Sequence, residues 1–180
     1  MRKCVSLSLI AASLLAAATP AAAQYAQATP QAAEIAAPQM ESQLLPDNGG
    51  LQLASDQRVT VAVDGATGAL SIVNSEALGF NAVAPGPGGA ASVPSTAQPG
   101  TVVYSLQGPV LKIENGLATA FNYSAVAALD VNGQASSQTV KTCTVLPGRV
   151  AFEMWSATVK IPSVILGAPV AYAGVPGCGG

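Results

Sequence analysis

The chain has 180 residues, of which only 9% are charged, and it contains no histidine. Histidine is the side chain most used in acid-base catalysis and in binding transition metals, so the sequence excludes nucleophile–histidine hydrolases and histidine-based zinc sites. The formal net charge is −2, whereas nucleic-acid binding depends on clustered Lys and Arg. We therefore expect no cofactor, no metal site and no nucleic-acid partner.

Residues 1–23 have the pattern of a secretory signal peptide. Arg2 and Lys3 form a positive start, Val5–Ala18 is apolar, and Ala21–Ala23 is a small-residue cleavage site. We expect cleavage before Gln24 and a bacterial protein exported to the periplasm, the cell surface or the medium, where cysteines can pair. An uncleaved membrane anchor is the alternative, although the apolar stretch is short for a span of about 20 residues.

Residues 24–50 are rich in Ala, Gln and Pro. Pro30, Pro38 and Pro46 are spaced through the segment and limit the length of any helix. We expect a flexible linker, with a short packed helix around Ala32–Ala37 as the alternative.

A single β domain is expected over residues 51–180, because apolar residues recur at every second position from Leu51. Arg58–Asp64 alternates in this way, the turn residues 64–68 follow, and Leu70 and Ile72 resume the alternation, which indicates a hairpin. Residues 80–100 contain repeated Pro and Gly and are expected to form a surface loop.

The second half of the chain carries most of the expected strands, at 102–106, 111–114, 117–123, 125–131, 140–146, 149–155, 158–161 and 164–166. Turn signals separate them at 107–109, 115–116, 132–133 and 147–148. The fold class is therefore mainly β: an antiparallel β-sandwich-like domain of short strands and hairpins. In the strand after Pro147-Gly148, the alternation assigns Val150, Phe152 and Met154 to the core.

Two cysteines, Cys143 and Cys178, remain once Cys4 has left with the signal peptide. In an oxidising compartment the simplest outcome is one disulfide bond between them. A redox pair is the alternative, but its usual Cys-x-x-Cys spacing is missing.

A candidate binding surface consists of Arg149, Glu153 and Trp155, which share the other face of the 149–155 strand. Trp155 could form an aromatic floor for a carbohydrate or a peptide, and an ordinary exposed salt-linked row is the alternative. A hydrolase that uses only carboxylates would draw on Glu114, Asp130 and Glu153, yet nothing in their context distinguishes them from surface charges.

We therefore expect an exported, non-catalytic β-domain protein of the periplasm or cell surface with a structural or binding role, and no enzyme activity. A secreted hydrolase using only carboxylates is the alternative. The expected partners are a cell-envelope component or further copies of the chain, joined through sheet edges. Val164–Leu166, within the uncharged C-terminal run, is the segment expected to self-associate.

Overall fold

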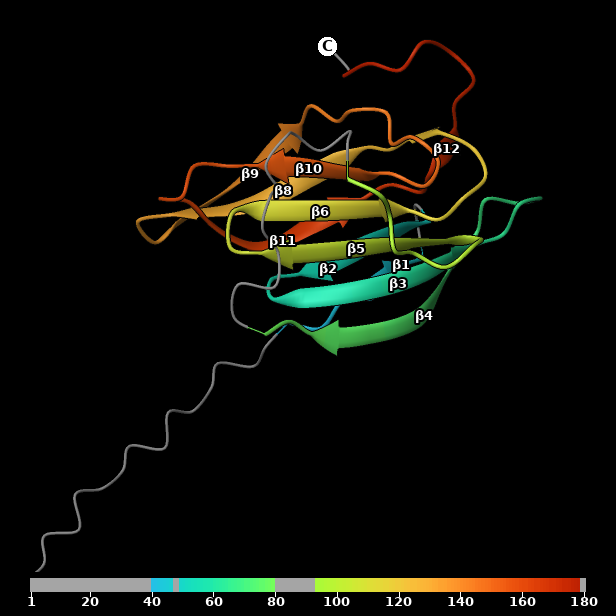
Figure 1. The fold of residues 1–180 in the computed structure, drawn as a ribbon. Helices are drawn as coiled ribbons and strands as arrows, with labels where there is room; N and C mark the ends of the chain where they lie inside the picture. The colour runs from blue at the N-terminus through green and yellow to red at the C-terminus, as the bar shows by residue number, and fades with distance from the viewer. Residues whose placement is uncertain (1–39, 47–48, 80–92, 179–180) are drawn as a thin grey trace, which may run out of the picture. The chain divides into compact units, whose positions relative to one another are not determined.

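The computed structural model describes residues 40–46, 49–79 and 93–178, which form strands β1 to β12 and no helix (Figure 1). The proposed signal peptide (1–23), the alternative helix around Ala32–Ala37 and residues 80–92 lie outside the described residues. The described strands all belong to one compact unit, Pro38–Gly180.

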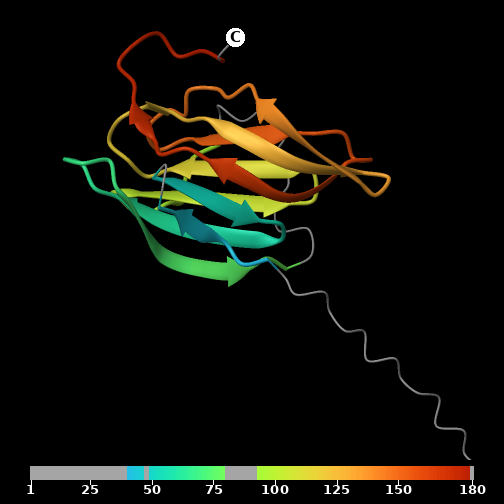
Figure 2. The same ribbon diagram turned by 180° about the vertical axis from the view of Figure 1, so that it is seen from behind.

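Two five-stranded antiparallel sheets pack face to face, as Figures 1 and 2 show, and this confirms the expected β-sandwich-like fold. Sheet A has the order β1 (Gln43–Leu45), β2 (Gly50–Ala54), β11 (Lys160–Leu166), β8 (Ala125–Val131), β9 (Gln134–Val140). Sheet B has the order β10 (Val150–Met154), β6 (Val110–Asn115), β5 (Thr101–Gln107), β3 (Gln57–Val63), β4 (Leu70–Ala77). A small third sheet pairs β7 (Phe121–Asn122) with β12 (Val170–Ala171).

The core lies between the two sheets and is built from alternate residues of their strands. Val59 and Val61 of β3 are fully buried, as the alternation predicts. The other fully buried large side chains include Leu51, Leu53, Val102, Tyr104, Leu106, Leu111, Ile113 and Leu166. The core therefore depends on branched aliphatic side chains and two deeply buried aromatics, Tyr104 and Phe121.

Turn chemistry predicts several connections correctly. Asn132 and Gly133 have φ angles of 55° and 79° and join β8 to β9 as a two-residue hairpin. Positive φ at both positions is what the twist of paired strands favours, and Asn-Gly adopts it readily. Asp64 stabilises the β3–β4 turn, because its Oδ1 accepts hydrogen bonds from the N–H groups of Ala66 and Thr67.

One strand, β1, lies within residues 24–50, the segment expected to be a linker. β1 pairs with β2 in the register Leu44 to Leu51, so residues 43–45 are part of sheet A. Residues 93–100, the described part of the expected loop at 80–100, form no named strand but are held against sheet B. Pro94 forms a bridge with Arg149, and Thr96 donates two hydrogen bonds to the carboxylate of Glu114.

Asn115-Gly116 does not form the expected hairpin. β6 lies between β5 and β10, so no side of β6 is left to pair with the residues that follow Asn115. The chain after Asn115 instead crosses to the small sheet, where it forms β7. Asn115 is fully buried, and its side chain hydrogen bonds to backbone groups instead of closing a two-residue turn. Gly116 is required here by close approach, since any Cβ would collide with the backbone oxygen of Gln98.

β10 faces the opposite way from the prediction. Its register with β6 places Ala151 beside Ile113, and these two side chains point into the core. Of the three residues assigned to the core, Val150 is buried at 3% exposure, whereas Phe152 is only partly buried and Met154 is 65% exposed. The turn at Leu146–Arg149 does form, with Gly148 at φ 62°, but it does not connect two paired strands.

The expected strand at 140–146 is replaced by β9, which ends at Val140. Val145 forms only an isolated bridge with Phe121. β11, which contains Val164–Leu166, is the central strand of sheet A between β2 and β8. Val164 and Leu166 are fully buried, so this segment is not an edge for self-association.

Candidate functional site

The predicted surface of Arg149, Glu153 and Trp155 does not come together as one exposed row. Arg149 is exposed, whereas Trp155 packs partly buried against the core. The Glu153 Oε1 accepts a hydrogen bond from the Tyr123 hydroxyl at 2.8 Å and from the N–H of Cys143 at 3.4 Å. Burial raises the pKa of Glu153 more than these hydrogen bonds lower it. Glu153 therefore acts as an internal acceptor.

The three acids considered for a hydrolase occupy separate surroundings. Glu153 lies beside Leu111 on the core side of sheet B, while Glu114 lies on the outer side of the same sheet. Asp130 belongs to sheet A, where its Oδ1 accepts a hydrogen bond from Gly133 in the β8–β9 turn. A carboxylate-pair mechanism needs two acids on either side of one cleft, and this arrangement provides no such pair.

Glu114 is the centre of a charge cluster on the outer face of sheet B. Its side chain is 2% exposed, and Oε1 lies 2.7 Å from the Lys112 ammonium and 3.8 Å from the Arg58 guanidinium. Oε2 accepts hydrogen bonds from the N–H and the hydroxyl of Thr96 at 2.9 and 2.7 Å. Burial raises the pKa of this carboxyl, but the contacts with Lys112 and Thr96 outweigh burial and hold the pKa below its ordinary value.

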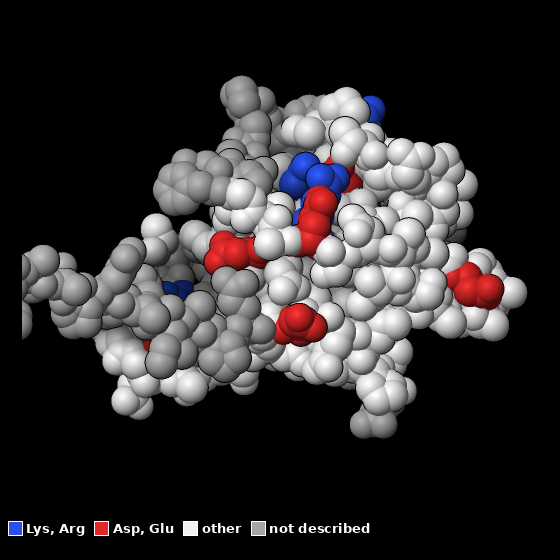
Figure 3. All heavy atoms as spheres, turned by 90° about the horizontal axis from the view of Figure 1, so that it is seen from below, with Lys and Arg blue, Asp and Glu red and all other residues white. Residues whose placement is uncertain are grey.

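The cluster has a structural role, because it fixes the segment around Thr96 to sheet B. Arg58 also lies 3.7 Å from Glu76, so two cations face two carboxylates. Figure 3, which views the molecule from below, shows one group of Lys and Arg atoms directly against Asp and Glu atoms, and further acidic groups that stand apart from it. Most of the described surface in this view carries neither kind of charge.

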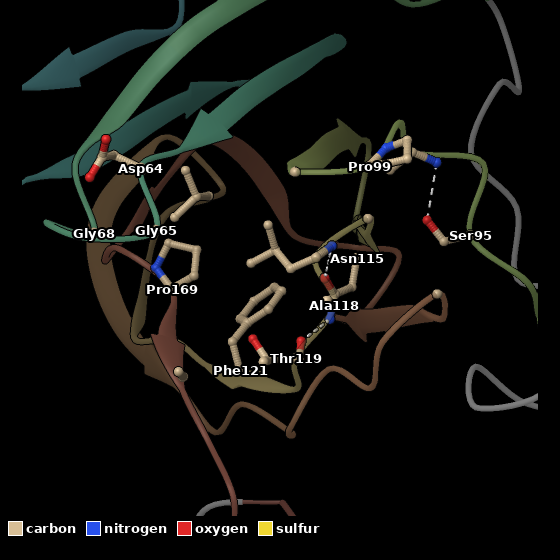
Figure 4. A pocket seen from close by; sticks show the side chains of 17 residues that line it. Asp64, Gly65, Gly68, Ser95, Pro99, Asn115, Ala118, Thr119, Phe121 and Pro169 are labelled. Carbon is tan, nitrogen blue, oxygen red and sulfur yellow. Dashed lines mark hydrogen bonds between the residues drawn. The ribbon is translucent and has the colours of Figure 1, made fainter.

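A groove with a volume of about 690 Å³ lies at one end of the sandwich (Figure 4). It lies between the β3–β4 turn, the segment 95–100, the segment 115–121 and residues 169–171. We call this hollow the end groove. The connecting segments that line it come together because they leave the two sheets at the same end, as loops do in β-sandwiches.

Asn115 fixes one rim of the end groove. Its side-chain amide donates to the backbone oxygens of Thr119 and Val145 at 3.0 and 3.1 Å, and its Oδ1 accepts from the N–H of Leu117 at 2.7 Å. These three bonds hold residues 116–120 in an irregular path without strand pairing. The groove therefore has a preformed rim, as small-molecule sites usually do.

The lining of the end groove is mainly apolar. In Figure 4 the side chains of Phe121 and Pro169, both buried, point toward the hollow, and Leu117 and Ala118 line it as well. Asp64 is the one ionisable residue among the described residues of the lining. Three hydrogen bonds from Thr67 and Ala66 reach its Oδ1 and lower its pKa, so this carboxylate is already engaged in its own turn.

Sequence reasoning missed the end groove, although it identified pieces of the lining as turn signals. Asp64–Gly68 and Asn115-Gly116 carry the composition of turns, but their meeting at one end depends on the strand order. The clustering of loops at the ends of a sandwich is the only signal that could have indicated such a groove.

Cys143 and Cys178 are joined by the predicted disulfide. Within the described residues, no three His, Cys, Asp or Glu side chains are grouped so that they could hold a metal ion. The same part of the chain contains no helix long and apolar enough to cross a membrane. Comparisons with protein-family models, curated proteins and solved structures found no match for this chain.

Proposed function

We propose that this protein is an exported, non-catalytic β-sandwich that binds an uncharged, mostly apolar small molecule in its end groove. The observation that carries the proposal is the groove itself. Its volume of about 690 Å³ lies within the range of about 300–1,000 Å³ that is usual for small-molecule sites. Its apolar lining favours an apolar ligand, because binding removes apolar surface from water on both sides.

The charge of the groove defines the ligand class further. Asp64 alone is ionisable among the described lining residues; it is exposed to water, which screens its charge, and its Oδ1 is bonded within its own turn, so the apolar side chains dominate the contacts with a ligand. The Thr119 hydroxyl lines the groove and makes no hydrogen bond within the described part of the chain, so it can donate one to the ligand. An uncharged ligand with one or a few acceptor atoms fits this chemistry best.

Two observations support the exported and non-catalytic parts of the proposal. The signal-like residues 1–23 and the Cys143–Cys178 disulfide are both typical of proteins in oxidising compartments. The separation of Glu114, Asp130 and Glu153 favours a binding role over the carboxylate hydrolase.

The neutral fluorescent dye Nile red can test the groove. We expect the dye to bind the mature protein with a rise in fluorescence and Ala118→Phe, which fills the groove, to weaken binding by at least about tenfold. Ala77→Phe on β4 is the matched control, since Ala77 is exposed and does not line the groove. Equal dye binding by Ala118→Phe and the wild type would overturn the assignment of the groove.

A further inference from the structure

β9 is an edge strand with an open side. Within the described residues it pairs only with β8, over seven consecutive residue pairs and without a shift of register. Its sequence, Gln134–Val140, is uncharged and lacks proline, and six of its seven residues are exposed. Figures 1 and 2 show β9 at the outer border of sheet A, on the same side of the sandwich as β10.

The other edges of the described sheets carry features that protect edges from pairing with another chain. β1 has only three residues. β4 is interrupted by a shift of register at Val73 and carries Glu76. The first residue of the β10 edge is already paired, because the N–H of Val150 donates a hydrogen bond to the backbone oxygen of Val93. β9 is seven residues long and carries no bulge, charged residue or proline that would protect its edge in this way.

The hairpin turn determines which backbone groups of β9 are open. In a two-residue hairpin the closing pair, here Val131 and Gln134, is hydrogen-bonded, and bonded and non-bonded pairs then alternate. Gln134, Ser136, Gln138 and Val140 therefore direct their N–H and C=O groups toward β8. Ala135, Ser137 and Thr139 direct theirs away from the domain.

We propose that β9 pairs in antiparallel fashion with β9 of a second copy of the chain, centred on Ser137. In this register Ser137 lies opposite Ser137 of the second copy and Ala135 lies opposite Thr139. All three outward-facing residues then form bonded pairs, with about six hydrogen bonds across the interface. The two A sheets join into one continuous sheet.

The side chains favour a second copy as the occupant. Ser136 lies opposite Gln138 of the second copy, an uncharged pair that can hydrogen bond across the strands. The same register places Lys141 opposite Gly133 of the second copy. The N–H of Gly133 is bonded to the carboxylate of Asp130, so the Lys141 ammonium of one copy lies near the Asp130 carboxylate of the other at both ends of the interface. An edge contact of this size is small, so the dimer should be weak and dependent on protein concentration. None of these residues lines the end groove, and the two proposals therefore stand independently.

Sedimentation velocity of the mature protein over a wide concentration range tests the pairing. We expect the wild type to dimerise and both Ser137→Lys and Ser137→Glu to weaken dimerisation at least about tenfold, because each places like charges opposite one another at the two-fold axis. An equimolar mixture of the two variants should restore the dimer, because Lys then faces Glu. Ser71→Lys on β4 is the matched control and should dimerise as the wild type does.

A wild type that stays monomeric at all concentrations would overturn the proposal, as would Ser137 variants that dimerise normally. A mixture that remains monomeric would overturn the register centred on Ser137. The Nile red titration reports on the groove alone, so failure of one proposal is distinguishable from failure of the other.

Discussion

Replacing Glu114 by glutamine should destabilise the domain markedly, although the side chain keeps its shape. The glutamine oxygen can accept both hydrogen bonds from Thr96. Its NH₂ group then takes the place of the Glu114 Oε1, which lies 2.7 Å from the Lys112 ammonium in the wild type, and two donors face each other. One bond between charged partners is lost, which costs about 1.5–3 kcal/mol. Lys112 is 25% exposed and can turn toward water, so the loss should stay below the roughly 3–5 kcal/mol of a fully buried broken pair.

Urea denaturation of the mature protein measures this loss, and Glu76→Gln is the matched control. Glu76 is 51% exposed and lies 3.7 Å from Arg58, so the control should change the free energy of unfolding by less than about 1 kcal/mol. If Glu114→Gln changes it no more than Glu76→Gln does, the Glu114 cluster does not hold residues 93–98 to sheet B.

The pH dependence provides a second readout of the same residue. The pKa of Glu114 lies below its ordinary value of 4.5 in the folded protein, so the carboxylate stabilises the fold above pH 4.5. That contribution is lost as the pH falls below 4.5 through the folded-state pKa, and the gap between the wild type and Glu114→Gln should narrow there. A gap that stays constant on acidification would refute this reasoning.

Three further substitutions have defined outcomes. Tyr104→Phe should raise the free energy of unfolding by about 1 kcal/mol or more in urea denaturation, because the buried Tyr104 hydroxyl has no hydrogen-bond partner among the described residues; a loss of stability would contradict this. Replacing Cys143 and Cys178 together by serine should lower the free energy of unfolding by on the order of 3–4 kcal/mol, since the disulfide closes a loop with a sequence separation of 35. Alkylation followed by mass spectrometry should find no free thiol in the unreduced wild type. Glu153→Gln should have a higher melting temperature than the wild type at neutral pH, because a single oxygen accepts both hydrogen bonds and the glutamine oxygen can replace it, and because the raised pKa of Glu153 shows that its charged form is unfavourable in the fold. This advantage should vanish below pH 4.5, where the Glu153 carboxyl is protonated, and a lower melting temperature of the variant at pH 7 would contradict the prediction.

Strands and hairpins were predictable from the sequence wherever one face is clearly apolar or a turn requires particular residues. Val59 and Val61 alternate with polar residues and face the core, and Asn132-Gly133 adopts the positive φ angles that its composition favours. These features depend on neighbours in the sequence, so local patterns suffice to predict them.

The orientation of β10 was not predictable in this way, because both of its faces carry apolar residues. Val150, Phe152 and Met154 alternate with Ala151 and Trp155, and the pairing with β6 decides which set faces inward. Pairing between residues far apart in the sequence also determines the end groove. Its lining was recognised only as separate turns, since nothing local indicates which turns meet.

The place of β11 has a consequence for how the chain assembles as it is synthesised. Sheet B is complete once residues 57–154 exist, and its β5–β6 and β3–β4 pairs join strands that are close in sequence. Sheet A instead receives its central strand from Lys160–Leu166, so β2 and β8 cannot be joined until residues 160–166 have been synthesised. A nascent or truncated chain that ends before Lys160 therefore exposes two additional apolar strand edges, and such species are prone to aggregate until β11 is inserted.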